Sequence, residues 1–400
     1  MRLLHVICST DPESGGPIEA ILRNAELLLR DGHEIQIVSL ESQEEADLLK
    51  LPIPVIGVGQ GIGRYRYNSR LTSWLSEHAS NFDAVILNGL WNYSSLGAWR
   101  ALRKLSTPYF IFTHGMLDPW FRSKYPLKHW AKQVYWTLGE GRVLHDARAV
   151  LFTCEEEMIS ARGVFLGHPY RECVVTFGTA DPGGDAEKQK QSFAGALPAL
   201  SGRKFLLYLS RIHPKKGCDL LVEAFAANVA DLPSDVDLVI AGPDHLGWAK
   251  DLQALAARLG IGERVHWPGM LIGDQKWGAF RSADAVILPS HQENFGFVIA
   301  EALACAKPVL ISNKVNIWRE ILAAKAGFVE PDTLQGTQNL IHNFYSLSPQ
   351  ERAQMAMDAR TGFLRNFNIE SNARSFARTI ARLSEEPKNT GTTMREKIVS

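Results

Sequence analysis

Short apolar blocks alternate with segments of helical periodicity along most of this chain. The apolar block Leu3–Ser9 is followed by a helical repeat over residues 18–30 and then by a second apolar block, Ile35–Leu40. A strand, a helix and a strand in this order form a unit with parallel strands, and helices cover both faces of such a sheet. The alternation resumes after residue 205, and 400 residues are enough for more than one core. The sequence therefore predicts an α/β fold with two domains.

The domain boundary is predicted where periodicity is lost, between residues 174 and 204. This stretch holds the turn-rich segment 179–184 and then a charged run. We expect a first domain over residues 1–180 and a second over residues 200–367. Residues 385–400 are rich in Pro, Asn, Gly and Thr and predict a flexible tail.

Composition and charge exclude several classes of function. The 43 Lys and Arg residues balance the 43 Asp and Glu residues, so no global field attracts nucleic acid. The five cysteines are scattered and form neither a C-x-x-C pair nor a zinc-spaced cluster, which predicts a reduced, cytoplasmic protein without a structural metal. The N-terminal apolar block is too short for a signal peptide, and no apolar run approaches the roughly 18 residues of a membrane span.

The segment 285–301 has the pattern of a strand, a polar turn and a helix. Ala285–Leu288 is a short apolar block, and a helical repeat begins after Gly296. Free N–H groups at such a helix start favour phosphate or sugar oxygens. Glu293 precedes this start and Glu301 lies one to two turns inside the helix. Two acids at this spacing also fit a helix-dipole partner and a solvated helix face, so the segment needs support from the rest of the chain.

A second strand-to-helix turn carries cations. Arg211, Lys215 and Lys216 follow the apolar block Phe205–Leu209 and precede Gly217. A guanidinium can fork onto two phosphate oxygens, while an ammonium acts as a point charge, so the pair suits a pyrophosphate. A solvated loop is the alternative interpretation.

Two turns in the first half could also hold ligand groups. Gly15 and Gly16 lie between the first strand and its helix, where glycines let the backbone approach a ligand. Glu41 ends the second strand, as the ribose-binding acid of dinucleotide folds does, but the G-x-G-x-x-G spacing is missing. His114 follows the strand 108–113 and precedes a glycine, a place where parallel sheets hold ligand groups; a histidine buried in the core is the alternative.

Residues 120–136 interleave aromatic side chains with cations. A helical stripe of apolar residues begins in this segment and extends just beyond it; it consists of Leu127, Trp130, Ala131, Val134 and Leu138. Either this amphipathic helix packs on its own domain, or its surface rests on anionic lipid headgroups or grips a lipid-linked pyrophosphate acceptor.

These motifs together resemble the retaining nucleotide-sugar glycosyltransferases of family 4. The acids Glu293 and Glu301 match the E-x7-E signature, Arg211 to Gly217 is similar to the R-x4-K-G turn, and Gly15-Gly16 matches a phosphate-contacting turn. The segment from His114 to Trp120 is similar to the exopolysaccharide-building branch of that family. The resemblance covers roughly residues 1–383. It implies the GT-B architecture: two Rossmann-like domains facing across a cleft, with a C-terminal helix, 368–384, that crosses back to the first domain.

The resemblance also implies the roles of individual residues. Catalysis would involve His114, Glu293, Arg211 and Lys216, with Arg211 and Lys216 on the diphosphate, and Glu293 and His114 beside the sugar. Glu301 would bind the ribose hydroxyls. The set that binds the nucleotide sugar consists of Gly15, Gly16, Arg211, Lys216, Met270, Leu271, Glu293, Asn294, Phe295, Gly296, Phe297, Val298 and Glu301. Phe177-Gly178-Thr179 stands where relatives carry Asn-Gly, a departure that concerns the hinge.

The implied reaction is transfer of a hexose with retention of configuration. A UDP-sugar is favoured, UDP-glucose first, with a saccharide or polyprenyl-linked saccharide as acceptor in exopolysaccharide or cell-surface glycan synthesis. No metal or cofactor is expected: Asp235-Val236-Asp237 fits the D-x-D of metal-dependent enzymes but begins a buried strand, away from the ligand crevice. Location at the inner face of the cell membrane is expected. An epimerase acting on a UDP-amino sugar and a catalytically silent sugar-nucleotide-binding subunit remain alternatives.

Overall fold

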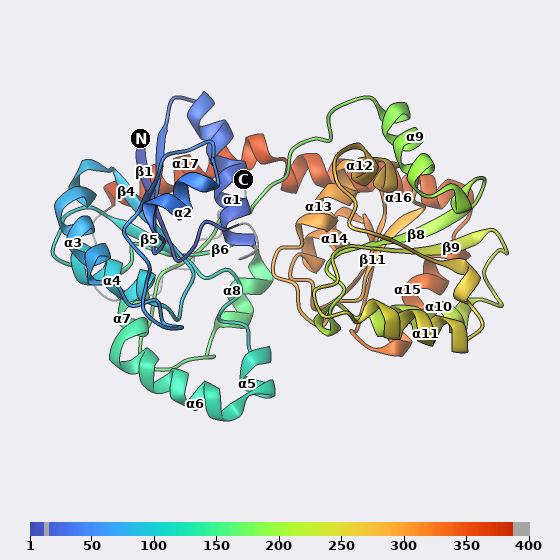
Figure 1. The fold of residues 1–400 in the computed structure, drawn as a ribbon, viewed down its shortest axis with the longest axis horizontal. Coiled ribbons are helices and arrows are strands. Elements are labelled where there is room, and N and C mark those ends of the chain that lie inside the picture. The colour runs from blue at the N-terminus through green and yellow to red at the C-terminus, as the bar shows by residue number, and fades with distance from the viewer. Residues whose placement is uncertain (12–15, 387–400) are drawn as a thin grey trace. The chain divides into compact units, whose positions relative to one another are not determined.

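The computed structural model describes residues 1–11 and 16–386 (Figure 1). The chain divides into two compact units. The first comprises Met1–Gly178 together with the residues from Ile369 onward, and the second comprises Thr179–Asn368. Each unit is built around its own parallel sheet, which confirms the α/β class and the two Rossmann-like domains predicted from the alternation. That the domains face each other across a cleft stays a prediction.

The first unit holds a seven-stranded sheet in the order β3-β2-β1-β4-β5-β6-β7, with every neighbouring pair parallel. Its strands are β1 (Arg2–Ile7), β2 (Glu34–Ser39), β3 (Val55–Gly57), β4 (Ala84–Asn88), β5 (Tyr109–Phe112), β6 (Val150–Phe152) and β7 (Glu172–Val174). The strand order reverses between β1 and β4. The carboxyl ends of these two strands therefore border the position at which open α/β sheets bind ligands.

Helices cover both faces of this sheet, with α1 and α17 on one face and α3, α4 and α7 on the other (Figure 1). The helices are α1 (Gly16–Arg30), α2 (Gln43–Leu48), α3 (Ser69–His78), α4 (Tyr93–Leu102), α5 (Trp120–Lys124), α6 (Pro126–Tyr135), the π-helix η3 (Trp136–Glu140), α7 (Gly141–Asp146), α8 (Glu155–Ala161) and α17 (Ile369–Glu385). The C-terminal helix α17 is tied to this unit because Asn372 donates to the Phe177 carbonyl at 2.9 Å and Arg374 pairs with Asp31 at 2.9 Å. This confirms the predicted return of the C-terminal helix to the first domain.

The second unit holds a six-stranded parallel sheet in the order β10-β9-β8-β11-β12-β13. Its strands are β8 (Lys204–Leu209), β9 (Val236–Ala241), β10 (Val265–Gly269), β11 (Ala285–Leu288), β12 (Val309–Ser312) and β13 (Gly327–Glu330). The strand order reverses between β8 and β11. The segments that follow these two strands are the two turns in which the sequence predicted phosphate and sugar ligands.

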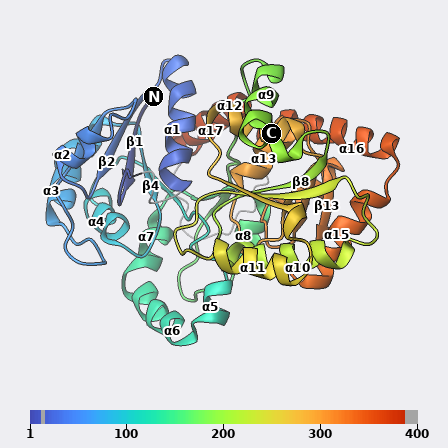
Figure 2. The same cartoon turned by 45° about the vertical axis from the view of Figure 1, so that its right-hand side comes forward.

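Helices α10, α11 and α15 cover one face of this sheet, and α9, α12, α13 and α16 cover the other (Figures 1 and 2). The helices are α9 (Ala186–Ala196), α10 (Cys218–Asn228), α11 (Ala249–Arg258), α12 (Gly273–Ser282), α13 (Phe297–Ala304), α14 (Trp318–Ala324), α15 (Leu334–Ser346) and α16 (Pro349–Gly362), with the 3-10 turns η5 (Pro214–Lys216) and η6 (Gly262–Arg264) and the π-helix η7 (Phe363–Phe367). Among the helices of residues 1–11 and 16–386, none is long and apolar enough to cross a membrane.

Residues 181–199, which the sequence analysis left between the two expected domains, contain α9 and belong to the second unit. Asp185 caps the helix, accepting from the backbone of Glu187 at 2.9 Å. A side chain at Gly278 of α12 would come within 2.0 Å of the Gln189 carbonyl of α9, so the two helices pack closely. Gln189 and Phe193 are the buried residues of α9, too few to give a clear apolar period in the sequence. The predicted flexible tail falls almost wholly on residues 387–400, which lie outside the described part of the chain.

Candidate functional site

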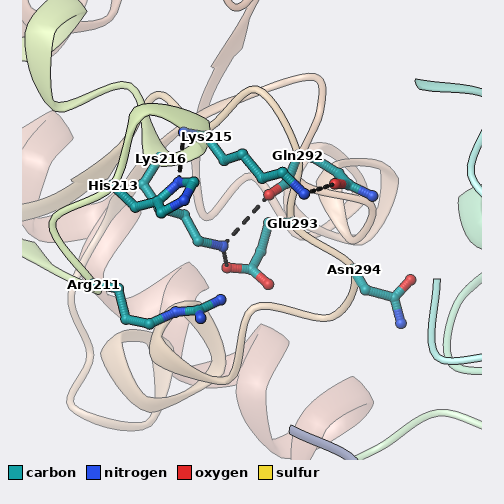
Figure 3. Close-up of a pocket in the computed structure, with 7 residues that line it drawn as sticks. All are labelled: Arg211, His213, Lys215, Lys216, Gln292, Glu293 and Asn294. Carbon is teal, nitrogen blue, oxygen red and sulfur yellow. Dashed lines mark hydrogen bonds and ion pairs between the residues drawn. The ribbon is translucent and has the colours of Figure 1, made fainter. Parts of the chain in front are cut away.

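A polar pocket of about 260 Å³ lies at the carboxyl edge of the second sheet, beside β8 and β11, between which the strand order reverses (Figure 3). Its lining comes from the loop after β8 and the loop after β11, and consists of Arg211, His213, Lys215, Lys216, Gln292, Glu293 and Asn294. Two sequence motifs separated by more than 70 residues therefore form one site, at the position where doubly wound sheets bind ligands.

Local backbone geometry fixes the first loop against the second. His213 caps the short turn η5, its Nδ1 accepting from the Lys215 amide at 3.0 Å. Gly217 ends the turn with a φ of 69°, and a Cβ there would lie 2.2 Å from the Pro289 carbonyl oxygen. Only glycine meets both conditions. The Tyr208 hydroxyl also donates to the Arg211 carbonyl at 2.9 Å, which fixes the start of the loop.

Lys216 and Glu293 form the centre of the pocket. The Lys216 ammonium pairs with the Glu293 carboxylate, and the two side chains are 9% and 21% exposed. The Glu293 backbone is held on both sides, since its N–H donates to the Lys314 carbonyl at 2.9 Å and its carbonyl accepts from the Asn316 amide at 3.0 Å. The strand-to-helix loop thus presents the acid at a fixed place.

The remaining charges make the pocket cationic. Arg211 is exposed, and its side chain runs beneath the Lys216–Glu293 pair (Figure 3). Lys215 is half-buried, and its ammonium approaches the Gln292 side-chain oxygen at 3.4 Å. Burial lowers the pKa of His213, and the cations Arg211, Lys215 and Lys216 lower it further. One carboxylate among three full cations suits a ligand with more than one negative charge.

The helix α13 begins beside this pocket. Gly296 is its N-cap with a φ of 72°, and Phe297 is its first residue, as the change of period predicted. Phe295 is buried and packs edge-on against Phe297, with 4.9 Å between the ring centroids. The amide end of this helix favours anionic groups. Asn294 and Val298, the other predicted ligands of this segment, are half-buried.

Glu301 lies one turn into α13 and is 3% exposed. Its carboxylate pairs with the Lys276 ammonium of α12 at 2.8 Å, a partner that the sequence analysis missed. Met270 and Leu271, which belong to the predicted nucleotide-sugar-binding set, directly follow β10; Met270 is 66% exposed and Leu271 is 6% exposed. They therefore lie at the same edge of the sheet as the pocket.

The predicted residues of the first unit occupy the carboxyl edge of its own sheet. His114 follows β5 with a φ of 48°, in the left-handed region. Burial, with a smaller contribution from His5, lowers the pKa of His114 to about 3, so its imidazole is neutral at physiological pH. Gly16 is the exposed first residue of α1, and Gly15 lies outside the described residues.

Two acids that resemble ligands of other protein classes have internal partners. Glu41 is buried and accepts from Ser9 and Thr10 at 2.5–3.1 Å. Asp237 is 1% exposed and pairs with Arg203 at 2.6 Å and His266 at 2.8 Å. Within residues 1–11 and 16–386, no group of three or more His, Cys, Asp or Glu side chains is arranged to hold a metal ion.

Two family models match the chain. Residues 189–362 match the glycosyl transferases group 1 model, and residues 15–178 match the glycosyl transferase 4-like domain model. Each of these two parts of the chain thus matches a glycosyltransferase domain. The first match ends at residue 178, and the structure divides the chain between Gly178 and Thr179.

Several curated glycosyltransferases are similar in sequence. The D-inositol 3-phosphate glycosyltransferase of Actinosynnema mirum is 33% identical over 183 residues, 43% of this chain and 43% of that protein. The corresponding enzyme of Mycolicibacterium gilvum is 29% identical over 255 residues, 61% of this chain and 55% of that protein. The chain thus spans about half the length of the curated relatives it matches.

Solved structures match almost the whole chain. HepE of Anabaena, solved in complex with UDP and glucose, is 19% identical, with a TM-score of 0.74 over 96% of this chain and 100% of its own. A glycosyltransferase from Rickettsia africae is 17% identical, with a TM-score of 0.79 over 96% and 99%. At these identities the likeness shows the fold, and it confirms the GT-B class predicted from the sequence.

Sequence reasoning missed the residues that support the site rather than form its motifs. Lys276 lies in a different helix from its partner Glu301. The backbone carbonyl of Gln292 lies 3.4 Å from the Lys216 ammonium, but Gln292 carries no charge by which the sequence could identify it. Asn88, which contacts His114, is the last residue of a buried strand. A polar residue at the carboxyl end of a strand beside the reversal of strand order is the signal that could have identified Asn88.

Proposed function

We propose that this glycosyltransferase moves a hexose from a nucleotide sugar to a saccharide or lipid-linked saccharide. The observation that carries the proposal is the cationic pocket that brings Arg211 and Lys216 together at the carboxyl ends of β8 and β11. A nucleoside diphosphate is the leaving group of such a transfer, and its charge grows as the glycosidic bond breaks. Fixed cations at that place stabilise the transition state more than the bound substrate.

The other residues of the second unit divide between the parts of the nucleotide sugar. Glu301, held by Lys276, would accept from the ribose hydroxyls, and Met270 and Leu271 would contact the base. The amide end of α13 would share the diphosphate with Arg211 and Lys216, so we propose that transfer needs no metal. Glu293 is paired with the Lys216 ammonium. A bound phosphate would accept a hydrogen bond from the same ammonium, and Glu293 would then border the sugar.

We propose UDP-glucose as the first substrate to test. Support comes from HepE of Anabaena, which shares the fold and was solved with UDP-glucose, and from the similarity of the His114–Trp120 segment to the exopolysaccharide branch. The family resemblance also supports retention of configuration, with the acceptor attacking on the face that the diphosphate leaves and the phosphate taking the acceptor's proton. The product would be part of an exopolysaccharide or another cell-surface glycan.

The surface of α6 supports an acceptor held at the cytoplasmic face of a membrane. Helix α6 has no buried residue, and with α5 it extends away from the sheet (Figures 1 and 2). Leu127 and Trp130 are 87% and 70% exposed, so the apolar stripe does not pack on its own domain. Lys124 and Lys128 are exposed on the same segment, whereas the Lys132 ammonium lies 4.3 Å from the centre of the Trp91 ring. Exposed apolar and cationic side chains on one helix suit an anionic lipid surface.

A panel of nucleotide sugars tests the proposed function. The nucleotide sugar that binds should raise the melting temperature by mass action, and we expect UDP-glucose to do so. With that compound and a saccharide acceptor, Arg211→Ala should raise the activation barrier of transfer by about 2–4 kcal/mol, the usual loss for one such stabilising group. Lys250→Ala, an exposed cation on α11, is the matched control and should be neutral. Conversion of the nucleotide sugar without an acceptor would identify an epimerase instead, and binding without transfer or hydrolysis would identify a silent subunit.

A further inference from the structure

Asn88 links three neighbouring strands at the carboxyl edge of the first sheet. It is the last residue of β4, between β1 and β5, and it is 4% exposed. Its side-chain oxygen lies 3.2 Å from His114 Nε2, and its side-chain nitrogen lies 3.3 Å from His5 Nδ1. The same nitrogen donates to the backbone carbonyls of Ile86 at 3.0 Å and Val6 at 3.3 Å.

These contacts determine which way the Asn88 amide is turned. Carbonyl oxygens can only accept, so the atom that faces Val6 and Ile86 must be the NH2 group. The oxygen therefore faces His114, and because it can only accept, His114 Nε2 must carry the proton. A neutral imidazole has one proton on its ring nitrogens, so His114 Nδ1 is left with a lone pair. Among the described residues, no hydrogen bond is made to that Nδ1.

The surrounding rings and the buried position keep His114 in this neutral form. Its imidazole lies 5.5 Å from the Phe112 ring and 6.0 Å from the Phe177 ring, measured between centroids. Phe177 is part of the segment that departs from the Asn-Gly of relatives, and here its ring helps to enclose the histidine. Burial lowers the pKa of His5 to about 4, so the other histidine of the network is neutral as well.

Glu157 of α8 holds the backbone on both sides of His114. This carboxylate is 4% exposed. Its Oε1 accepts from the Thr113 hydroxyl at 2.7 Å and from the Gly115 amide at 2.6 Å. Its Oε2 accepts from the Thr153 amide at 2.7 Å and hydroxyl at 2.8 Å. A left-handed backbone conformation costs a non-glycine residue of order 1–3 kcal/mol and persists only where the surroundings enforce it. Four hydrogen bonds to one buried carboxylate supply that constraint.

We propose that Asn88 and Glu157 are positioning residues that present His114 Nδ1 as a fixed hydrogen-bond acceptor for a hydroxyl group of the transferred sugar. The inference rests on the proposed function for its ligand, and on the geometry of the first unit alone for the state of the histidine. An imidazole in this state accepts from a hydroxyl but cannot donate a proton through Nδ1. His114 thus orients the sugar and does not act as an acid in the transfer.

Nitrogen NMR of the imidazole tests the tautomer in the unaltered protein. With ¹⁵N-labelled histidine, and with the His114→Gln variant to assign the signal, we expect a protonated Nε2 and an unprotonated Nδ1 throughout pH 5.5–8. A protonated Nδ1 in that range, as the other tautomer or as imidazolium, would overturn the proposal. This measurement needs no nucleotide sugar, so it stands even if the proposed function fails.

The positioning role is tested by variants together with deoxy sugars. Asn88→Leu keeps the branching of the side chain but removes the acceptor for His114 Nε2–H, so we expect a mixture of tautomers and a turnover about tenfold lower, the size of one hydrogen bond. In a set of nucleotide sugars that each lack one hydroxyl group, the compound without the hydroxyl that His114 accepts from should be a poor substrate for the natural protein. Asn88→Leu should discriminate less between that compound and the complete nucleotide sugar. The exposed Asn81→Leu serves as the control. Equal discrimination in the Asn88 variant, or a single Nε2–H tautomer with natural turnover, would refute the role.

Glu157→Gln examines the backbone clamp. The introduced NH2 group would face N–H or O–H donors, so this variant should unfold at a lower temperature and show reduced turnover. Glu156→Gln, at the next position and hydrogen-bonded to Ser160 at 3.2 Å, should leave both unchanged. If Glu157→Gln folds and matches the natural protein in turnover and in the His114 nitrogen signals, the clamp plays no part.

Discussion

The Lys216–Glu293 pair gives a prediction that distinguishes a phosphate site from an ordinary ion pair. Lys216→Ala removes a cation and also leaves Glu293, 21% exposed, without its partner at the same place. A bound diphosphate would then lose an attraction, while the repulsion from the Glu293 carboxylate stays. Glu293→Gln in the same chain removes the repulsion alone. The two substitutions should therefore change nucleotide affinity in opposite directions, and the double variant should regain the affinity that Lys216→Ala loses.

The expected size follows from the burial of the pair. Two unit charges about 5 Å apart interact by about 3 kcal/mol at an effective dielectric constant of about 20. Solvent reaches both side chains in part, so we take about half of that for each of the two effects. Lys216→Ala should then weaken UDP binding by about 1.5 kcal/mol, or about tenfold, and the double variant should bind UDP about as tightly as the natural protein. Glu293→Gln alone should bind UDP at least as tightly as the natural protein, but transfer sugar more slowly because Glu293 would border the sugar.

Titration calorimetry with UDP at a low, fixed salt concentration measures the four affinities. Lys250→Ala and Glu263→Gln, both at exposed positions of the second unit, are the controls for charge and should leave affinity unchanged. Thermal unfolding of each variant shows whether the fold is intact. A double variant as weak as Lys216→Ala, or weaker UDP binding by Glu293→Gln, would show that the phosphate does not lie beside this pair.

Three further predictions concern stability and surface. Burial raises the pKa of Glu140 from its usual 4.5 to about 7, so the folded state holds this proton more tightly than the unfolded state; the stabilisation is complete below pH 4.5 and is lost as pH rises to 7. In Glu140→Gln, the urea midpoint of unfolding should therefore change less with pH across this window, and the free energy of unfolding at pH 8 should exceed that of the natural protein by up to about 3 kcal/mol. A pH dependence of the midpoint equal to that of the natural protein would refute the assignment. Gly217→Ala should destabilise the second unit by well over 1 kcal/mol in the same assay, whereas Gly202→Ala, with a similar φ of 72° and no atom within 4 Å of an added Cβ, should cost only about 1 kcal/mol; equal losses would contradict the close contact with Pro289. In vesicle sedimentation, the natural protein should bind anionic vesicles at low salt and lose binding on Lys124→Glu with Lys128→Glu or on Leu127→Ser with Trp130→Ser, while Lys250→Glu should not matter; no binding at low salt would end the membrane proposal.

The parts of the site that could be predicted from sequence are those encoded locally. Arg211 to Gly217 and Glu293 to Phe297 each combine a buried strand, a turn and a helix start within a few residues, so their chemistry is visible in one stretch. Parallel strands place the carboxyl ends of both stretches at one edge, which is why separate motifs meet in one pocket.

The supporting contacts could not be predicted because they join distant segments. Lys276 and Glu301 are 25 residues apart on two helices. Asn88 ends β4, and His114 follows β5, 26 residues later in the chain. Helix α9 was missed because it buries few of its residues, so polar side chains conceal its period. The periodicity of α6 was visible, but a helical stripe does not state whether it faces a core or a solvent-exposed surface, and only the structure shows Leu127 and Trp130 to be exposed.

The most direct test of the account is a crystal structure of the protein with an intact nucleotide sugar, chosen from the thermal-shift panel. The account predicts that the diphosphate contacts the Arg211 guanidinium, the Lys216 ammonium and the amide end of α13, with no metal ion between them. A diphosphate bound elsewhere on the second unit, or held by a metal ion with Arg211 and Lys216 turned away, would contradict it.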